Sequence, residues 1–183
     1  EAEIWSRLDH PHVLQFLGIC QIGPIMYLAS PWQSNGNMSE YLKVYPDFDR
    51  YTLAMAGAVN YLHLNEPSIV HGDIKGSNIM ISARGEPLLC DFGLSIILSE
   101  IPFIEDVPSG LHDAGRYVLP LIVNDSNCLI NFQLLPSLRY SAPELLVGNG
   151  AEDLKTRESD TFAFAMLIIE ASIVLATYPT RIN

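Results

Sequence analysis

Four polar side chains in the middle of the chain have the types and the order that phosphoryl transfer requires. Asp73 can accept the proton of a hydroxyl group, and Lys75 can reach the same side and neutralise a transferring phosphoryl group. Asn78 and Asp91 offer a neutral and an anionic oxygen ligand for magnesium. A strand–turn–strand hairpin between these two residues would bring both ligands to one mouth, and Gly93 lets the backbone turn directly afterwards.

Two other interpretations compete with this one. Asp73 and Asp91 could be ordinary acidic residues of surface loops, and a single short motif would leave that alternative open. Two motifs in this order and spacing, with Ala142-Pro143-Glu144 downstream, favour the catalytic interpretation. A metal hydrolase would need more ligands, because His10 and His12 form a pair with no acidic cluster nearby.

Composition and charge limit the class of protein and its partners. The chain has 183 residues, of which 49% are hydrophobic and 17% charged, as in a globular domain. A net charge of −11 disfavours nucleic acids and anionic membranes as partners. Cys20, Cys90 and Cys128 are far apart and form no disulfide or zinc pattern, which predicts a reducing, cytoplasmic compartment. The apolar run 161–177 contains Glu170 and is expected to form a buried helix, not a membrane span.

Hydrophobic periodicity predicts the elements that position these residues. We expect the end of an amphipathic helix over 1–9, with Ile4, Trp5 and Leu8 on one face, and two strands over 13–20 and 24–30. A short helix at about 38–43 precedes a longer one at about 48–63, whose core positions should be Leu53, Ala56, Val59, Tyr61 and Leu62.

The second half of the chain is predicted to contain shorter elements. Residues 69–71 lead into a polar loop, and 79–82 and 87–90 should form a hairpin with a glycine turn. Asp160 stands where it could cap the N-terminus of a helix over 161–172.

Motifs in this region resemble those of one family. The run His71-Gly72-Asp73-Ile74-Lys75-Gly76-Ser77-Asn78 resembles the catalytic loop H-R-D-x-K-x-x-N of eukaryotic protein kinases, and Asp91-Phe92-Gly93 resembles their metal-binding DFG motif. Ala142-Pro143-Glu144 matches the A-P-E that closes the activation segment. Ser159-Asp160-Thr161-Phe162 resembles the start of the buried lower-lobe helix, whose aspartate anchors the catalytic-loop backbone.

The resemblance implies a fold and an activity. The fold would be α+β, a truncated two-lobed protein-kinase-like fold with a small antiparallel sheet and one helix in the upper lobe and a mainly helical lower lobe. The activity would be ATP-dependent phosphoryl transfer to serine and threonine hydroxyls of a protein substrate, with Mg as the metal. We expect one partial domain over 1–183, in which 1–30 is a remnant of the upper lobe, 31–36 the hinge and 37–183 an incomplete lower lobe.

The resemblance also assigns roles to residues. Asp73, Lys75 and Asn78 would be catalytic, and Asn78 and Asp91 would hold magnesium. ATP binding would use residues around the hinge: Ser30 as the gatekeeper, backbone groups of Pro31 and Gln33 toward adenine, Met80 under the adenine ring, and Asp91.

The first helix fits the same resemblance. Glu1 falls on the helix glutamate that normally pairs with the strand-three lysine. A stacked apolar spine between the lobes would consist of Trp5, Phe16, His71 and Phe92.

The residues within these motifs indicate a subgroup of the kinase family. Lys75 after Asp73 is typical of serine/threonine kinases, since tyrosine kinases usually place alanine there. The stretches IVHGDIKGSN, LLCDFGLS and LRYSAPELL are similar to the tyrosine-kinase-like serine/threonine kinases of mushroom-forming fungi.

Several departures from the family predict impaired activity. No G-x-G-x-x-G occurs, and the only lysines are Lys43, Lys75 and Lys155, so the glycine-rich loop and the strand-three lysine are expected to be missing. The alternative is therefore a catalytically inactive kinase-like fragment or interaction module. Gly72 replaces the usual arginine, which predicts that activation-loop phosphorylation does not switch the protein.

The later parts of the chain depart further. Deleting 116–136 restores the family pattern G-[ST]-x-x-Y-x-A-P-E and would return Ser137 to the side of Asp73. That segment is either a translated intron or a family-specific loop insert. Residues 171–183 do not resemble the family, and Glu144 is expected to lack its usual arginine partner and to be left unsatisfied.

Overall fold

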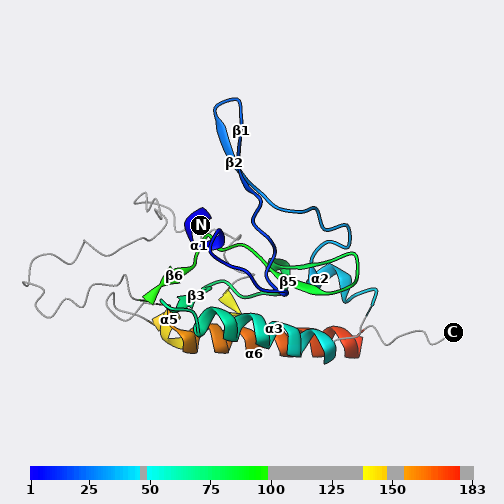
Figure 1. The fold of residues 1–183 in the computed structure, drawn as a ribbon. Helices are drawn as coiled ribbons and strands as arrows, with labels where there is room; N and C mark the ends of the chain where they lie inside the picture. The colour runs from blue at the N-terminus through cyan, green and yellow to red at the C-terminus, as the bar shows by residue number, and fades with distance from the viewer. Residues whose placement is uncertain (46–48, 99–137, 148–154, 178–183) are drawn as a thin grey trace, which may run out of the picture.

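The computed structural model describes residues 1–45, 49–98, 138–147 and 155–177. A long helical layer forms one side of the molecule, and a hairpin projects from the opposite side (Figure 1). The layer contains α3 (Asp49–His63) and α6 (Arg157–Thr177), which lie side by side. Short strands and loops lie between the helical layer and the hairpin (Figure 1). This arrangement confirms the expected α+β kinase-like fold.

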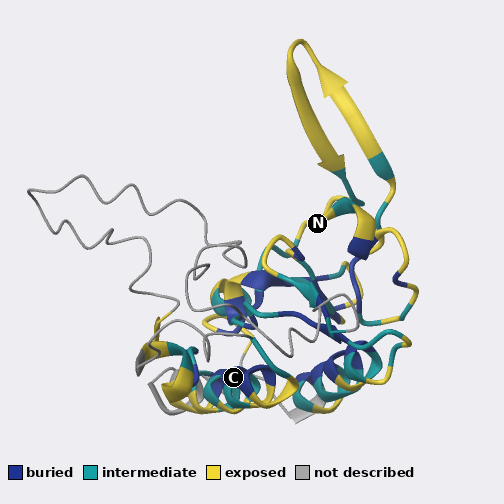
Figure 2. Cartoon of the chain, turned by 90° about the vertical axis from the view of Figure 1, so that its left-hand side faces the viewer, coloured by how far each residue is buried: buried dark blue, intermediate teal, exposed yellow. Residues whose placement is uncertain are grey.

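The N-terminal part consists of one short helix and one hairpin. Helix α1 (Ala2–Trp5) is shorter than predicted, but its expected apolar face is correct because Ile4, Trp5 and Leu8 are all buried. Strands β1 (Gly18–Ile22) and β2 (Ile25–Ala29) pair antiparallel around a turn at Gly23, whose φ is 61°. Both faces of the hairpin are largely exposed (Figure 2).

The first of the two predicted strands is displaced along the chain. It was expected over 13–20, but β1 begins only at Gly18, whose φ of 141° redirects the backbone. Val13 and Leu14 pair instead with Leu89, the latter through a backbone hydrogen bond of 2.8 Å. Both side chains are buried, so their apolar character reflects a place in the core of the lower part, not in the hairpin.

The two helices that follow the β1–β2 hairpin lie where the sequence predicts them, but α3 buries a different face from the one expected. Helix α2 (Met38–Tyr41) begins at Asn37, whose side chain accepts a hydrogen bond from the backbone of Glu40. In α3, the expected core positions Val59 and Leu62 are buried, but Leu53 is 79% exposed. The buried face of α3 instead carries Tyr51, Met55, Ala58, Val59 and Leu62.

The error at Leu53 has a geometric cause. Successive residues of an α-helix are rotated by about 100°, so Leu53 lies roughly 200° from Tyr51 around the α3 axis. Tyr51 and Met55 are each 1% exposed and therefore define the inner face. The expected core residues Ala56 and Tyr61 lie at the edges of this face and are half-buried.

Helix α6 begins earlier than predicted. It starts at Arg157, so Asp160 lies in its first turn and the predicted N-cap role is wrong. The cap is formed instead by Thr156 and Ser159, since the backbone N–H of each donates to the hydroxyl of the other. Residues 171–177, which did not resemble the family, continue the helix. No helix in the described part of the chain is long and apolar enough to cross a membrane.

Three small antiparallel pairs of strands complete the described structure. Besides the hairpin, β3 (Ile69–Val70) pairs with β6 (Ile96–Ile97), and β4 (Ile79–Ile81) pairs with β5 (Pro87–Leu89). The β4–β5 hairpin confirms the prediction. A 3₁₀ turn, η1 (Gly76–Asn78), precedes β4, and α5 (Pro143–Val147) begins within the A-P-E motif.

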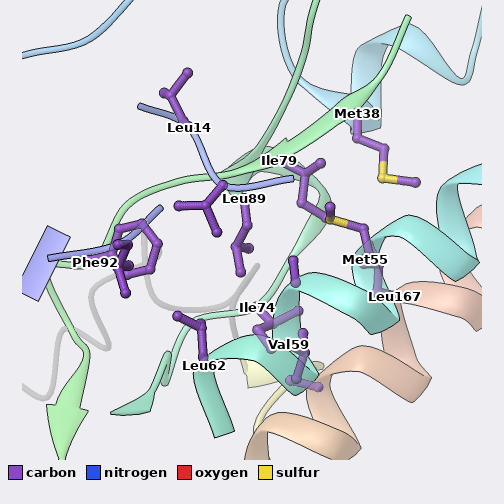
Figure 3. Packing of buried hydrophobic residues seen from close by; sticks show 14 of the residues in the cluster. Leu14, Met38, Met55, Val59, Leu62, Ile74, Ile79, Leu89, Phe92 and Leu167 are labelled. Carbon is purple, nitrogen blue, oxygen red and sulfur yellow. The ribbon is translucent and has the colours of Figure 1, made fainter. Parts of the chain in front are cut away.

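One hydrophobic core joins these elements. Side chains from α3, α6 and the β4–β5 hairpin meet in it, including Met55, Leu62, Ile79, Leu89 and Leu167 (Figure 3). The loop that carries the polar motif, 71–78, runs along this core, since Ile74 is 1% exposed. The loop is therefore anchored to a rigid base.

Candidate active site

Asp160 fixes the first two residues of the predicted catalytic loop. Its Oδ2 accepts the backbone N–H of His71 and its Oδ1 accepts that of Gly72, both at 2.8 Å. The Nε2 of His63, at the end of α3, lies 3.0 Å from Oδ2. Asp160 is 1% exposed, so a buried carboxylate is satisfied by three polar groups. The expectation that this aspartate anchors the loop backbone is confirmed.

His71 is a buried structural residue of the same loop. Its Nδ1 accepts the backbone N–H of Asp73 at 3.3 Å, so its Nε2 carries the proton and donates to the Cys90 carbonyl at 3.1 Å. Burial lowers the pKa of His71, which keeps the ring neutral and this pattern of bonds intact. His71 therefore joins the catalytic loop to the segment that begins the DFG motif.

Asp73, Lys75 and Asn78 come together in one cluster. The Asp73 Oδ2 accepts Lys75 Nζ at 2.6 Å and Asn78 Nδ2 at 2.8 Å. Asn78 Nδ2 also donates to the Asp73 backbone carbonyl at 3.0 Å. The side chains of Lys75 and Asp73 are 20% and 14% exposed, so the ion pair remains accessible from solvent. The structure thus brings the three predicted catalytic residues into direct contact.

The β4–β5 hairpin places Asn78 close to the DFG motif. Asn78 directly precedes β4 and Cys90 directly follows β5, and the Cys90 backbone N–H donates to the Asn78 carbonyl at 3.0 Å. Asp91 comes one residue later, with a φ of 67°, and its side chain is exposed. The hairpin therefore brings the backbones of Asn78 and Asp91 close together at its open end, and their roles as magnesium ligands stay predictions.

The chemistry of Asn78 and Asp91 fits a magnesium ion. The Asn78 amide nitrogen donates two hydrogen bonds to Asp73, and the amide oxygen, which can only accept, takes no part in them. Magnesium is usually bound by one or two protein oxygens together with substrate phosphates. Among the described residues, no group of three His, Cys, Asp or Glu side chains could hold a metal without such help.

The predicted apolar spine is present as a chain of ring contacts. Trp5 lies with its ring centroid 5.2 Å from Phe16 and 6.1 Å from Phe92, and Phe92 lies 5.0 Å from His71. The Trp5 indole donates to the Leu14 carbonyl, which fixes its orientation. The DFG phenylalanine is thus held between the first helix and the catalytic loop.

The N-terminal glutamate reaches the same region. A Cβ atom built on Gly93 would lie 3.4 Å from Oε2 of Glu1 and 3.3 Å from Oδ1 of Asp91. Glu1 therefore lies next to the DFG motif. Its pairing with a strand-three lysine stays a prediction.

The residues of the predicted hinge form local hydrogen bonds of their own. The Gln33 side chain donates to the Pro31 carbonyl at 3.0 Å, and the Gln33 carbonyl accepts the Gly36 N–H at 3.2 Å. A carbonyl has two lone pairs, so both backbone oxygens can still accept a second donor. Ser30 and Pro31 are half-buried, and their roles toward adenine stay predictions.

Met80 lies next to the end of the predicted hinge. It forms a β-bridge with Asn37, and the following Ile81 N–H donates to the Gly36 carbonyl at 2.8 Å. Its side chain is half-buried and packs against the core. This position is compatible with the predicted place under an adenine ring.

The end of the activation segment is bound to α6. The Glu170 carboxylate accepts the Tyr140 hydroxyl with one oxygen and Arg139 Nη2, at 2.8 Å, with the other. Burial raises the pKa of Tyr140 to about 12, and the hydrogen bond to Glu170 adds to this shift. Glu170 was treated in the sequence only as an interruption of an apolar run. Arg139 and Tyr140 are both hydrogen-bond donors, and they were the one sequence signal that a carboxylate such as Glu170 could bind there.

Two predictions about this segment have different outcomes. Glu144 is exposed, so the expectation that it is left unsatisfied is wrong, because water can solvate it. Residues 116–136 and Ser137 lie outside the described residues. Their interpretation as a translated intron or a loop insert stays open.

Two further features of the site were not predicted. Gly72 has a φ of 76°, a conformation that favours glycine over the usual arginine of the motif. The side chain of Lys155 lies directly beside Gly72. No signal in the sequence connected these two residues.

Hollows in the surface also frame the site. A small cavity lined by Asp73, Tyr140, Ser141 and Asp160 lies between the catalytic loop and the start of α6. A second, wider and more open hollow is lined by His10 and His12. None of the residues that line it belongs to the polar cluster. The cavity beside Asp73 is therefore the one that belongs to the candidate active site.

Comparison with known proteins agrees with this geometry. The sequence model of the protein kinase domain matches residues 1–181. The chain therefore belongs to the protein kinase family.

Individual relatives are similar across much of the chain. The proline-rich receptor-like protein kinase PERK1 of Arabidopsis thaliana is 29% identical over 178 residues, which cover 93% of this chain and 23% of that protein. The salt tolerance receptor-like cytoplasmic kinase 1 of Oryza sativa subsp. japonica is 29% identical over 183 residues, covering 93% and 44%. Aurora kinase B of Drosophila melanogaster is 38% identical over 102 residues, covering 52% and 30%. The chain spans less than half the length of each of these relatives.

Proposed function

We propose that this chain carries the phosphoryl-transfer centre of a serine/threonine protein kinase that uses ATP and magnesium. The observation that carries the proposal is the contact of one Asp73 oxygen with both Lys75 and Asn78. An aspartate held between a cation and an amide can receive a hydroxyl proton while the cation neutralises phosphate charge. The substrate would be a hydroxyl-bearing side chain of a protein.

Each residue has a distinct task in this proposal. Asp73 orients the hydroxyl group and accepts its proton, and Lys75 stabilises negative charge on the phosphoryl oxygens. Asn78 and Asp91 would hold magnesium, which supplies charge neutralisation on the nucleotide phosphates when bound. Asp160 and His71 keep the loop backbone in place, so that these side chains need little reorganisation during the reaction.

The preference for serine and threonine rests on Lys75. We further propose that the chain belongs to the tyrosine-kinase-like serine/threonine kinases of mushroom-forming fungi, on the wording of its motifs. A phylogeny of kinase domains that placed this chain firmly in another group would contradict that assignment.

A second candidate is a catalytically inactive kinase-like module. The observation in its favour is that the 183 residues contain no G-x-G-x-x-G motif and no lysine before Lys43. Both features normally cover or grip the nucleotide phosphates. In this case the fold would remain but phosphoryl transfer would not occur.

One experiment separates the two candidates. Binding of a fluorescent ATP analogue is measured with and without magnesium, and transfer of radioactive phosphate to a generic protein substrate is measured in parallel. Three variants are compared with the parent chain: Asp73→Asn, Asp91→Asn and, as a matched control, Asp9→Asn. Asp9 is exposed and lies outside the polar cluster, so its variant controls for the loss of one negative charge.

The proposed function predicts a defined pattern of results. The parent and Asp9→Asn should bind the nucleotide in a magnesium-dependent way and transfer phosphate. Asp91→Asn should lose magnesium-dependent binding, whereas Asp73→Asn should bind nucleotide but lose transfer by about a hundredfold or more. A parent chain that binds nucleotide without any transfer would favour the inactive module.

We also propose that the protein works in the cytoplasm, free of nucleic acid and membrane. Cys20 and Cys90 are free thiols, as a reducing compartment allows. The net charge of −11 is unfavourable for binding to anionic surfaces. Fractionation of cells that express a tagged chain tests this, and recovery with membranes would contradict it.

A further inference from the structure

Lys155 fills the space that a side chain at residue 72 would need. A Cβ atom added to Gly72 would lie 2.5 Å from Cδ of Lys155, 2.9 Å from its Nζ and 2.8 Å from the Leu94 carbonyl oxygen. Atoms do not approach that closely, so a side chain at 72 would displace the end of the Lys155 side chain and would also meet the fixed backbone carbonyl of Leu94. The usual motif carries a cation at position 72, and this chain supplies one to the same space from a distant segment.

Lys155 also contacts the segment after the DFG motif. Its Nζ donates a hydrogen bond to the Leu94 carbonyl at 3.1 Å. The next residue, Ser95, donates its hydroxyl to the His71 carbonyl at 3.0 Å, and beyond it β6 pairs with β3. The segment over 94–97 thus runs antiparallel to the residues that lead into the catalytic loop.

The hydrogen bond from Lys155 lies where the antiparallel pairing of β3 with β6 ends. Gly72 cannot continue the pairing with Leu94, because its N–H is directed at Asp160. The Lys155 ammonium satisfies the Leu94 carbonyl instead, and the aliphatic stem of Lys155 covers Gly72. One side chain thereby joins the base of α6, the catalytic loop and the beginning of the activation segment.

The charge of Lys155 is suited to this position. Burial lowers the pKa of Lys155, while the carboxylates of Asp73 and Asp160 act in the opposite direction. These two carboxylates therefore favour the charged form of Lys155, against its burial and the nearby Lys75.

We propose that Lys155 is a positioning residue for phosphoryl transfer, which holds the DFG-proximal backbone at Leu94 against the catalytic loop in place of a side chain at residue 72. This inference rests on the proposed function. Lys155 touches neither nucleotide nor substrate in it, and it acts through the relative placement of Asp73 and Asp91.

The test compares three substitutions in the full chain. Lys155→Met keeps the stem but removes the charge and the donor, and Lys155→Arg keeps both. Lys43→Met is the matched control, because Lys43 lies just after α2, outside the polar cluster, and pairs with Glu40. Each variant is measured for kcat and for the KM of ATP, and for amide hydrogen exchange at residues 92–95.

A positioning role predicts a separation of the kinetic constants. Lys155→Met should lower kcat about tenfold while the KM of ATP changes less than about twofold. Lys155→Arg should recover most of kcat, and Lys43→Met should resemble the parent. Parent-like kcat in Lys155→Met, or equal losses in the Met and Arg variants, would overturn the inference.

Failure of the proposed function can be told apart from failure of this inference. A parent chain without transfer activity would contradict the proposed function, and the exchange data then decide about Lys155. Faster exchange at 92–95 in Lys155→Met but not in Lys155→Arg would show that Lys155 holds the backbone at Leu94 against the catalytic loop. Equal exchange in the parent and Lys155→Met would overturn it.

Discussion

Asp160, in the first turn of α6, accepts the backbone N–H of Gly72 at 2.8 Å. The bond joins the longest described helix to the second residue of the catalytic loop. Because the carboxylate is 1% exposed, its charge is compensated almost entirely by groups of the loop and of α3. The geometry of the polar cluster therefore depends on a residue that lies outside it.

Replacement of Asp160 by Asn should strongly destabilise the fold. An amide has only one acceptor oxygen, so the NH₂ group would face a backbone N–H of His71 or Gly72 and leave it unsatisfied. We expect the free energy of unfolding to fall by about 2–4 kcal/mol. Urea unfolding measures this, with the exposed Asp9→Asn as the control. A loss equal to that of the control would show that the bonds contribute little.

The backbone conformation of Gly72 predicts a contrast between two glycines. Gly72→Ala introduces a Cβ atom at a φ of 76° and against Lys155 and Leu94, which should destabilise the chain by about 1–3 kcal/mol. Gly57→Ala lies in α3 with no atom within 4 Å of the new Cβ, so it should stabilise the helix by about 0.5–1 kcal/mol. Thermal unfolding of both variants gives the two signs. The same sign for both would contradict the described backbone at Gly72.

The buried face of α3 can be tested with two leucines of one helix. Leu62 is 0% exposed, and Leu62→Ala should lower the free energy of unfolding by about 2–5 kcal/mol through the cavity it leaves. Leu53→Ala should change it by less than about 0.5 kcal/mol, because the side chain is 79% exposed. Urea unfolding of the two variants compares them directly. Similar losses would mean that Leu53 also packs in the core.

The Tyr140–Glu170 bond predicts a dependence of stability on alkaline pH. The pKa of Tyr140 is raised from 10.0 to about 12 in the folded chain, so the folded state holds this proton more tightly than the unfolded state. The resulting stabilisation is present below pH 10 and is lost as pH rises toward about 12. Tyr140→Phe lacks this contribution and should be less stable by about 1 kcal/mol at neutral pH.

The measurement compares unfolding of the parent and of Tyr140→Phe at about pH 8 and about pH 11. The difference between them should shrink at the higher pH. Tyr27→Phe, on the exposed hairpin, controls for the loss of a hydroxyl group. A difference between parent and Tyr140→Phe that grows with pH would contradict the raised pKa.

Local patterns in the sequence were sufficient for several elements. The β4–β5 hairpin was predicted correctly, because two short apolar runs flank a turn with Gly85. The cluster of Asp73, Lys75 and Asn78 was also predictable, since these residues lie within one loop and a short spacing restricts their distances. The contact of Phe92 with Trp5 followed from the family resemblance alone.

The predictions failed where a residue could adopt either of two structural roles and the local sequence could not decide between them. Asp160 had the residue type and position of an N-cap, but Thr156 and Ser159 form the cap and leave its carboxylate for the catalytic loop. Leu53 is apolar, yet the rotation of α3 directs it to solvent. In both cases the packing of α3 and α6 decided the outcome.

The sequence by itself determined the family, the order of the motifs and the residues proposed to perform phosphoryl transfer, because these depend on residue types at short spacings. Only the tertiary structure decided that Lys155 fills the space beside Gly72 and that Glu170 holds Tyr140. Those contacts join residues far apart in the chain. They exist because burial of the apolar faces of α3 and α6 brings the base of α6 against the catalytic loop, and no local pattern encodes that approach.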